Sequence, residues 1–489
     1  SHLDEAGGES LHDTVLPPEV ATDRICRGKW SADLVTKAAG KLAAPWPEEF
    51  VYTPEPLAST AGIVARPELY IDRGGLRVAR LANAVSGYVT YAVGALDKRF
   101  YVYDRGVWRP EDCQIGAVVS ALLGDAYRHS HLTNVEDTLR FRPDVRKIDC
   151  GPTPRWVNVA NGLLDWRTRD LVGHTPDVLS TVQLPVAWEP DAACPEFEKF
   201  IREVLPADCV DPCEGGPGFI RELIGYCVYS GNPHQIAVLL RGKGRNGKGA
   251  LLRVLQRLLG ACNVSAVSLH DLSENRFRLA DLYGKIANIA GDLDPKWLEN
   301  TAKLKGITGD DLMPAEHKFG RTFSFTPWAL PMYSANRGFA SADSSDAYFG
   351  RWVVVPFPNS FLGREDRGLD ARLAGELEGV LRLGVEALPA LMRRGRLPEP
   401  ASVRAAKHEF TIGGDQVRAW LDEGCEMDPA AWTKRTDLLE AYLMWDGLDG
   451  RSTLSKREFY ARLEQVGALR PAKRDGYDGF RGVRLQVDK

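Results

Sequence analysis

The sequence predicts an α/β protein with a parallel core sheet, preceded by a mixed α+β region and followed by a helical region that ends in a short β pair. Three observations predict this fold. The nearly continuous apolar run Gln235–Leu240 has the pattern of a buried parallel strand, and a Gly-rich loop follows it. Apolar residues then recur at helical spacing up to Gly260. Short apolar strands alternate with helices from there to Phe357.

Composition limits the class of protein. The chain has 489 residues, enough for about three domains, with 44% hydrophobic and 26% charged residues as in globular proteins. The formal net charge is only −4, so any nucleic-acid site must be a local surface. No apolar run reaches the roughly 18 residues of a membrane span, and residues 1–5 lack signal-peptide features. The closest cysteines, Cys209 and Cys213, have no partners at zinc spacing, so we expect reduced thiols without a metal role.

Changes in pattern divide the chain into six segments. They are 1–60, without an assigned role; 61–190, an α+β region; 191–234, a helical collar or linker; 235–360, the core; 361–410, a helical lid and linker; and 411–489, a C-terminal region. Within the α+β region, Val157–Asp165 carries an Asn-Gly turn between apolar runs, which predicts a hairpin. Tyr88–Val93 and Arg99–Trp108 have strand patterns, whereas Pro195–Val204 and Phe219–Tyr229 have helical ones.

The Gly-rich loop after the first core strand is a candidate phosphate site. Its glycines let backbone N–H groups converge on phosphate oxygens, and the N-terminus of the next helix adds a favourable dipole. Lys248 would supply a mobile cation to the β- and γ-phosphates. A glycine-rich turn without a ligand is the alternative, but the flanking strand and helix favour a site. The candidate ATP-binding residues are Gly242, Gly244, Asn246, Gly247, Lys248, Gly249 and Ala250.

One position departs from the usual phosphate loop. A Ser or Thr normally follows the lysine and binds Mg²⁺. Here Gly249 and then Ala250 follow Lys248, and neither offers a hydroxyl. We expect Mg²⁺ to be held through water and by an acidic residue elsewhere in the chain.

An acidic turn follows the second core strand, Lys285–Ala290. Carboxylates at the C-terminal end of such a strand lie beside the phosphate loop. Asp292 is therefore the candidate for the Mg²⁺ shell, and Asp294, or Asp292 itself, would polarise the attacking water. A solvated Asp-rich turn is the alternative.

A short hairpin with a basic tip is expected next, with Leu312–Glu316 and Arg321–Phe325 as its strands. His317 and Lys318 lie at the predicted tip. A basic tip on a rigid hairpin can contact a phosphate backbone, with an energy that falls as salt rises. The pattern by itself also fits a solvated hairpin.

Two further polar residues lie beside predicted core strands. Asn336 ends the run Trp328–Ala335 and could orient water against a γ-phosphate, although Pro331 removes a ladder donor from that strand. Arg351 precedes the apolar run Trp352–Val355, where an arginine could reach the γ-phosphate of a neighbouring subunit. The alternatives are a plain turn residue for Asn336 and a surface ion pair for Arg351.

Taken in order, these five motifs resemble superfamily 3 helicases, in particular the phage and plasmid primase-helicase family. Five modest motifs within about 110 residues make the resemblance specific. It implies an AAA+-like P-loop ATPase core that works as a hexameric ring. The implied roles are Walker A for Gly242–Gly249 with Lys248 on phosphate, Walker B for Asp292 and Asp294, sensor 1 for Asn336, an arginine finger across the subunit interface for Arg351, and a DNA-tracking hairpin for His317 and Lys318.

The similarity extends beyond the core. Residues 157–190 are similar to the domain that precedes the motor in this family, and the C-terminal segment is similar to its winged-helix end. Arg451–Gln465 would be the recognition helix, with Arg462 also available, and the following β pair would be the wing. The DNA-binding candidates are Lys456, Arg457, Arg474 and Arg481. A merely solvated winged-helix lid is the alternative.

Two other departures from the family pattern change the expectations. Gly350 stands where many relatives carry a second arginine, so Arg351 is the sole finger candidate. The unassigned residues 1–60 are too few for the primase domain that relatives often carry. We therefore expect no primase activity in this chain, and a separate primase or polymerase as a partner.

Three hypotheses about activity follow. The first is an ATP- and Mg²⁺-dependent helicase that moves 3′→5′ on single-stranded DNA and unwinds forks as a homo-hexamer, in the bacterial host cytoplasm, for a phage or mobile element. The family resemblance alone carries the direction and the ring. The second is an ATP-switched origin-binding initiator or loader, which the winged helix and the missing loop hydroxyl favour. The third, a small-molecule P-loop kinase, leaves the hairpin and Arg351 unexplained.

Overall fold

The computed structural model describes residues 60, 62–111, 113–293, 301–318, 320, 322–336, 345–445 and 454–486, and of Asp292 only the backbone. The chain separates into two units, Ser1–Ser59 and Thr60–Lys489, and the described residues belong to the second. The segment 1–60 therefore lies outside the described residues except for Thr60. Among the described helices, none is both long and apolar enough to cross a membrane.

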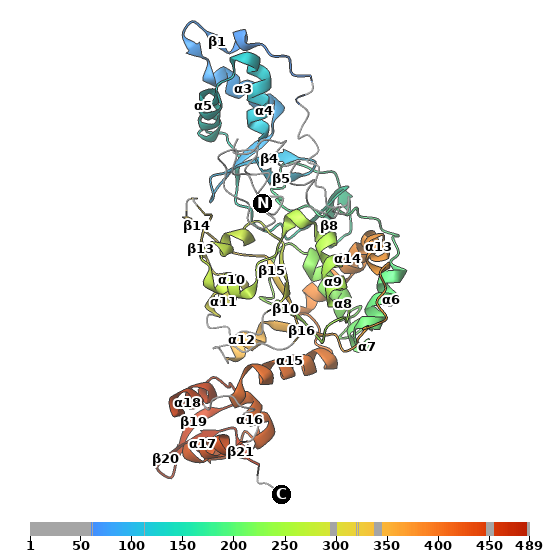
Figure 1. Cartoon of the computed structure of the whole chain (residues 1–489), viewed down its shortest axis with the longest axis vertical. Helices are drawn as coiled ribbons and strands as arrows, with labels where there is room; N and C mark the ends of the chain where they lie inside the picture. The colour runs from blue at the N-terminus through green and yellow to red at the C-terminus, as the bar shows by residue number, and fades with distance from the viewer. Residues whose placement is uncertain are drawn as a thin grey trace, which may run out of the picture. The chain divides into compact units, whose positions relative to one another are not determined.

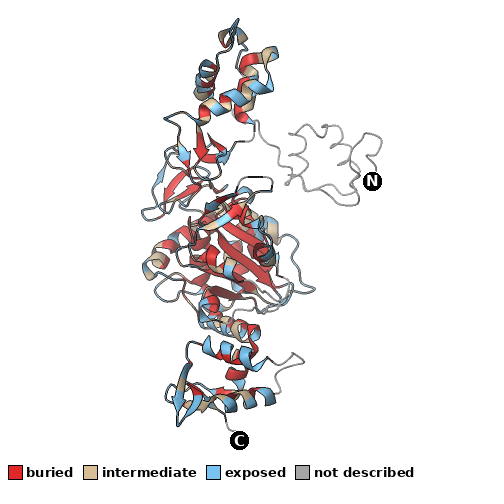
Figure 2. Cartoon of the chain, turned by 90° about the vertical axis from the view of Figure 1, so that its left-hand side faces the viewer, coloured by how far each residue is buried: buried red, intermediate tan, exposed pale blue. Residues whose placement is uncertain are grey.

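A five-stranded parallel sheet forms the centre of the described unit (Figure 1). In spatial order its strands are β11 (Val264–Ser265), β12 (Ala287–Asp292), β15 (Leu330–Ala335), β10 (Ala237–Arg241) and β16 (Trp352–Pro356). The strands are largely buried, as expected for a parallel sheet covered on both faces (Figure 2). The predicted parallel core is therefore present, and β15 forms as a central strand even though it contains Pro331.

The side chains of β10 alternate between two hydrophobic cores. Val238 and Leu240 belong to the larger core, whereas Ala237 and Leu239 belong to the smaller one. This alternation follows from the two-residue period of a strand, which points successive side chains to opposite faces. The apolar run that predicted the strand is thus divided between both faces of the sheet.

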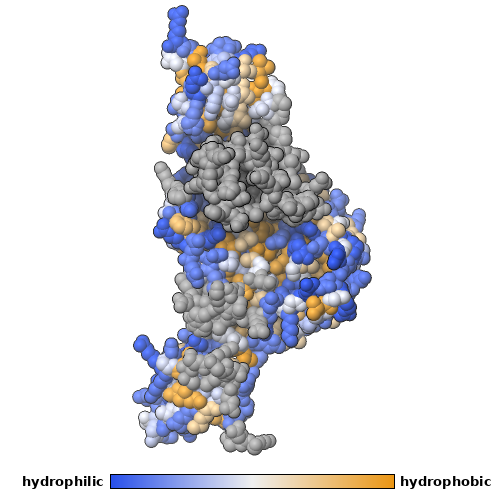
Figure 3. Space-filling view, in the orientation of Figure 1, coloured by the Kyte–Doolittle hydropathy of each residue, from blue (hydrophilic) through white to orange (hydrophobic). Residues whose placement is uncertain are grey.

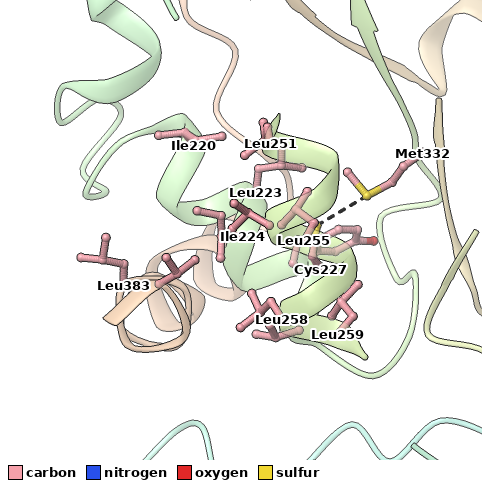
Figure 4. Packing of buried hydrophobic residues seen from close by; sticks show 14 of the residues in the cluster. Ile220, Leu223, Ile224, Cys227, Leu251, Leu255, Leu258, Leu259, Met332 and Leu383 are labelled. Carbon is pink, nitrogen blue, oxygen red and sulfur yellow. Dashed lines mark hydrogen bonds between the residues drawn. The ribbon is translucent and has the colours of Figure 1, made fainter. Parts of the chain in front are cut away.

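Helices that lie far apart in the sequence build the larger core. They are α8 (Phe219–Val228), α9 (Lys248–Leu259), α13 (Leu369–Ala374) and α14 (Leu377–Arg394). Figure 4 shows side chains of α8, α9 and α14 meeting there, with the Cys227 thiol 3.7 Å from the sulfur of Met332 in β15. Helices α8 and α14 approach so closely that a Cβ on Gly225 would lie 2.4 Å from the Gly384 carbonyl oxygen. Only glycine permits this contact.

The smaller core joins the other face of the sheet to a second set of helices. These are α10 (Leu269–Glu274), α11 (Ala302–Thr308), α12 (Asp346–Gly350) and α15 (Ala401–Gly414). Trp352 is central to it, because its ring makes edge contacts with Tyr348 at 6.2 Å and with Phe410 at 5.7 Å. The aromatic contacts fix α12 and α15 against β16. Short 3₁₀ turns, η5 (Ala261–Asn263) and η6 (Arg278–Leu282), precede β11 and β12.

The predicted segment boundaries around the core differ from the packing. The hairpin β7 (Trp156–Val159) and β8 (Gly162–Asp165) forms as predicted, with β9 (Leu171–Val172) as a third strand. Its apolar side chains share the larger core, as do those of α6 (Pro195–Val204) and α7 (Ala207–Val210). Helices of the predicted collar, 191–234, and of the segment 361–410 therefore bury their apolar faces against the sheet and its helices.

Residues 62–150 form a region with its own apolar core. Its elements are η3 (Pro67–Leu69), β1 (Ile71–Asp72), β2 (Gly75–Leu76), α3 (Val78–Tyr88), β3 (Tyr91–Gly94), β4 (Phe100–Asp104), β5 (Val107–Pro110), α4 (Gln114–Leu123), η4 (Gly124–Ala126), α5 (His129–Arg140) and β6 (Lys147–Ile148). Strands β5, β4, β3 and β6 make one sheet. The strand predicted from Tyr88 begins later, because Val89 still donates its N–H to the Val85 carbonyl at the end of α3.

In its described residues, the C-terminal region consists of three helices, a three-stranded sheet and a two-stranded sheet. The elements are α16 (Gln416–Gly424), β17 (Cys425–Glu426), β18 (Trp432–Lys434), α17 (Arg435–Met444), α18 (Lys456–Glu464), β19 (Arg470–Arg474), β20 (Tyr477–Arg481) and β21 (Arg484–Leu485). The predicted β pair is the hairpin β19–β20, and β18 joins it as an unpredicted third strand. Helix α18 starts at a capping box between Ser455 and Glu458. Residues 451–453 of the predicted recognition helix lie outside the described residues.

A buried ion pair links α8 to α14. Glu222 is fully buried, and Arg394 donates to both of its carboxylate oxygens, at 2.5 Å and 3.0 Å. Arg394 also donates to the backbone carbonyl of Glu214 at 3.1 Å. The carboxylate therefore depends on one guanidinium for its charge compensation.

We expect Arg394→Ala to lower the free energy of unfolding by about 3–5 kcal/mol, because it leaves the Glu222 carboxylate buried and unpaired. Melting temperature and urea midpoint would measure the loss. Arg382→Ala is the matched control in the same helix, since Arg382 lies 3.9 Å from a partly exposed Glu386 and should contribute less than about 1 kcal/mol. Equal losses in the two variants would contradict a special role for the buried pair.

Candidate active site

The Gly242–Gly249 loop connects β10 to α9 at the C-terminal end of the sheet. Gly247 has a φ of 92°, and a Cβ there would lie 2.6 Å from a methyl group of Val204. A Cβ on Gly242 would lie 2.3 Å from the Phe357 carbonyl oxygen. Both positions therefore require glycine, whereas a Cβ on Gly244 would meet open space.

Lys248 is the first residue of α9, and its ammonium group is held by three oxygens. It donates to the Gly242 carbonyl at 2.5 Å, to Asn246 Oδ1 at 3.2 Å and to Asn336 Oδ1 at 3.1 Å. The Lys248 residue is only 5% exposed. The predicted phosphate-binding lysine and the predicted sensor asparagine are thus in direct contact, because β10 and β15 are parallel neighbours whose C-terminal ends meet.

A cavity of about 570 Å³ opens beside this lysine. Its floor is the loop and the ends of two other strands, through Gly291 of β12 and Ser334 and Asn336 at β15. Its walls come from α6 and from the segment after β16; the main lining residues there are Lys199, Phe200, Glu203, Val204, Phe361, Glu365, Leu369 and Arg372. Backbone N–H groups at the start of α9 and the Lys248 ammonium make the floor suitable for an anion.

Ion pairs tie the segment 361–372 to the rest of the cavity wall. Arg245 in the loop donates to Glu365, and its backbone carbonyl accepts from the Phe361 N–H at 2.8 Å. Arg372 pairs with Asp366 at 2.6 Å and with Glu196 of α6 at 2.8 Å. The Arg372 hydrogen bond lowers the pKa of Asp366 below its ordinary value. Local sequence patterns do not show which residues make this wall, because they lie more than 100 positions from the loop on one side and about 50 on the other.

The acidic candidates are placed only in part. Strand β12 ends at Asp292, whose backbone pairs with Ser334 after an irregularity at Gly291. The side chain of Asp292 and the whole of Asp294 lie outside the described residues. Within the described part of the chain, no group of three or more His, Cys, Asp or Glu side chains could hold a metal ion. Oxygen donors suited to Mg²⁺ are nevertheless present at the strand ends, namely the Ser334 hydroxyl and the Asn336 amide.

Arg351 lies at the N-terminal end of the sheet strands, opposite the C-terminal end where Lys248 lies. Its carbonyl accepts from the N–H of Ala237, the first residue of β10, at 2.8 Å, and its guanidinium donates to Thr308 Oγ1 at 3.0 Å. Strand β10 spans four residue steps, or about 13 Å, between Ala237 beside Arg351 and the start of the loop. Arg351 does not line the cavity of its own chain.

The hairpin forms as predicted, from β13 (Met313–Glu316) and β14 (Thr322–Phe325). His317, at the β13 end of the tip, is only partly exposed. The imidazole stacks on Phe323 with ring centres 5.6 Å apart, and burial, followed by the nearby Arg99, lowers its pKa. The imidazole therefore packs against the hairpin, while Lys318 is exposed.

Aromatic contacts anchor this hairpin at its base. Tyr283 makes edge contacts with Phe323 at 5.0 Å and Phe325 at 5.2 Å, and its hydroxyl donates to the Asp149 carbonyl at 3.0 Å. The Trp328 indole N–H donates to the Cys150 carbonyl, also at 3.0 Å. Residues 149–150, which end the region before the core, therefore hold the base of the hairpin.

Exposed basic side chains gather on the C-terminal region. Between 454 and 486 there are eight basic and four acidic residues, in a chain whose formal net charge is −4. The four candidates, Lys456, Arg457, Arg474 and Arg481, are all exposed. Arg462 is not available as expected, because it pairs with the buried Asp415 at 3.3 Å. Figure 3 shows hydrophilic residues around a small apolar area in this region.

Comparison with known proteins finds similarity in two parts of the chain. Residues 90–206 match the family described as D5 N terminal like, and residues 240–351 match a family of unknown function, DUF5906. The second match contains the phosphate-loop, acidic, hairpin, Asn336 and Arg351 candidates.

Two viral proteins named as helicases are similar over part of the chain. Protein 121R of Invertebrate iridescent virus 3 is 23% identical over 224 residues, which cover 43% of this chain and 24% of that protein. Protein L207/L206 of Acanthamoeba polyphaga mimivirus is 23% identical over 181 residues, or 36% and 18% of the two chains. The chain thus spans a quarter or less of these relatives. With the D5-type match, they support a relationship to viral helicases.

Two solved structures of the apo C terminal region of NrS-1 also superpose on this chain. Their TM-scores are 0.47 and 0.48, with 12% and 11% sequence identity. Each comparison covers 83% of this chain and 98% of the solved chain.

Substituting two glycines of the loop tests whether the backbone conformation and local space at each position, rather than the loss of a glycine as such, determine stability. We expect Gly247→Ala to destabilise the fold by about 2–4 kcal/mol, because it adds a left-handed backbone penalty to a clash with Val204. Gly244→Ala, in the same loop but with open space around its Cβ, should leave the melting temperature nearly unchanged. Melting curves that shift equally for both variants would contradict this account of the loop.

Proposed function

We propose that this chain is an ATP-dependent DNA helicase. The observation that carries the proposal is the buried Lys248 ammonium, held between the Gly242 carbonyl and Asn336 at the floor of a cavity large enough for a nucleotide. The partial similarity to viral proteins named as helicases supports a motor on nucleic acid rather than a small-molecule kinase.

The loop residues would bind and orient the triphosphate. Backbone N–H groups of the Walker A loop would surround the β-phosphate, and Lys248 would neutralise charge on the β- and γ-phosphates. Asn336, which accepts a hydrogen bond from the lysine, would orient a water at the γ-phosphate. A magnesium ion bound with ATP would neutralise charge on the phosphates, and Asp292 is our candidate for its shell.

Two surfaces would contact DNA. Lys318 on the anchored hairpin can contact a single strand, and its contribution should fall as salt rises. The order helix, two short strands, helix, helix and two-stranded hairpin in residues 416–481 suits a winged helix, with Lys456 and Arg457 at the start of α18. On the family resemblance we propose a hexameric ring that moves 3′→5′ on single-stranded or forked DNA, in replication of a phage or other mobile element.

The position of Arg351 supports a shared active site between subunits. It lies at the N-terminal end of the sheet strands, whereas Lys248 lies at their C-terminal end, so it would serve the cavity of a neighbouring copy rather than its own. An arginine finger supplied in this way stabilises charge in the transition state. The sole candidate for that role in the described core is Arg351, since the residue before it is Gly350.

One observation favours a second candidate function, an ATP-switched initiator or loader. Gly249 and Ala250 leave the loop without the hydroxyl that usually binds Mg²⁺, which would suit slow turnover. Such a protein would bind ATP and DNA but would not separate strands processively. The two functions differ in DNA-stimulated turnover.

We expect ATP hydrolysis to rise with single-stranded DNA and to fall at least about 10²-fold in Lys248→Ala, the cost of removing one electrostatic contact to the transition state. Lys243→Ala is the control, since Lys243 is an exposed lysine of the same loop. Turnover in the original chain no higher than in Lys248→Ala would contradict the helicase and favour the loader. Strand separation on forks with a 3′ or a 5′ tail would test the direction.

We expect Arg351→Ala to lose about 10³-fold in turnover, because the finger charge disappears from the neighbouring site. Mixing Arg351→Ala subunits with Lys248→Ala subunits should restore part of the activity, since some interfaces then pair an intact lysine with an intact arginine. Thr308→Val removes the in-chain partner of Arg351 and should keep activity. A mixture that stays inactive would place Arg351 in a structural role.

A further inference from the structure

The magnesium site implied by the proposed function lacks its usual loop hydroxyl. Gly249 has no side chain, and Ala250 offers only a methyl group. Among the described residues that line the cavity, Ser334 alone carries a hydroxyl. It lies 86 positions after Lys248 in the sequence and reaches the cavity through the sheet rather than through the loop.

The sheet register fixes where Ser334 lies. It pairs with Leu240, the penultimate residue of β10, on one side and with Asp292, the last residue of β12, on the other. Asn336 follows two residues later and lines the same cavity, and its amide oxygen is 3.1 Å from Lys248 Nζ. Two residue steps in a strand span about 7 Å, so Ser334 lies within reach of the phosphate end of the cavity.

The Ser334 hydroxyl is available for a ligand. The residue is 5% exposed, and within the described part of the chain its hydroxyl has no hydrogen-bond partner. Buried hydroxyls are normally hydrogen-bonded, and structural serines in this core follow that rule: Ser265 bonds Asn288 at 2.9 Å and Ser273 bonds the Leu269 carbonyl at 2.9 Å. A hydroxyl on a residue that lines the cavity and has no protein partner is suited to water or a hydrated cation.

We propose that Ser334 replaces the missing Walker A hydroxyl in the magnesium shell of bound nucleotide. This inference rests on the proposed function and names the residue that completes its cation site. Mg²⁺ keeps several of its waters when it binds with phosphates, so a hydroxyl at the strand end can serve it without the short contact that a loop hydroxyl makes.

The test measures nucleotide affinity with and without the cation. The probe is a fluorescent, non-hydrolysable ATP analogue, titrated in Mg²⁺ and again in EDTA. We expect Ser334→Ala to weaken binding in Mg²⁺ about tenfold or more, as for other groups around a metal ligand shell, and to leave binding in EDTA unchanged. Ser334→Thr keeps the hydroxyl and should keep the Mg²⁺-dependent affinity.

A rescue in the loop provides the decisive comparison. Gly249→Thr restores the usual hydroxyl, and its Cβ would meet only the mobile end of Arg253, at 3.2 Å. We expect the double variant Ser334→Ala/Gly249→Thr to regain the affinity lost in Mg²⁺. Ser334→Ala/Gly249→Ala adds the Cβ without the hydroxyl and should not regain it.

Three outcomes would overturn the inference. Ser334→Ala could bind as tightly as the original chain in Mg²⁺, or it could lose affinity equally in Mg²⁺ and EDTA, which would indicate a packing role. The alanine and threonine changes at Gly249 could also rescue equally. An original chain that binds no nucleotide in either buffer would instead contradict the proposed function itself, and this inference with it.

Discussion

The buried ammonium of Lys248 is the constraint on which the centre of this protein depends. A charge removed from water is costly unless polar groups surround it. Two of the oxygens that accept hydrogen bonds from this ammonium group belong to the loop, and a third belongs to Asn336 at the end of β15. Loop conformation, helix start and strand pairing must therefore be correct together, and the left-handed Gly247 makes the turn that brings the lysine inward.

The packing behind the sheet supports that arrangement from a distance. Helix α9, which carries Lys248, shares its core with α8 and α14, and those two helices meet where Gly225 and Gly384 leave no room for a side chain. The Glu222–Arg394 pair then fixes their relative position through a geometry that tolerates little displacement. Residues well over 100 positions apart thus hold the floor of the cavity in place.

The hairpin connects this core to the region before it. Tyr283 and Trp328 bond the carbonyls of Asp149 and Cys150, and Tyr283 also packs on the aromatic residues of β14. His317 is part of the same aromatic cluster, where burial lowers the pKa of its imidazole below the ordinary value. The exposed charge of Lys318 is therefore presented on a rigid support.

The sequence by itself determined the parallel core, the Gly-rich loop with its lysine, the hairpin and the polar residue at the end of β15, because strand and helix periods and turn residues are local properties. It could not determine which residues meet. Only the tertiary structure decided that Asn336 contacts Lys248 and that α6 and 361–372 form the cavity wall. It also decided that Arg462 forms an ion pair with Asp415 and that Arg351 lies at the N-terminal end of the sheet strands. These contacts follow from sheet order and helix packing, which depend on long-range burial that no local pattern records.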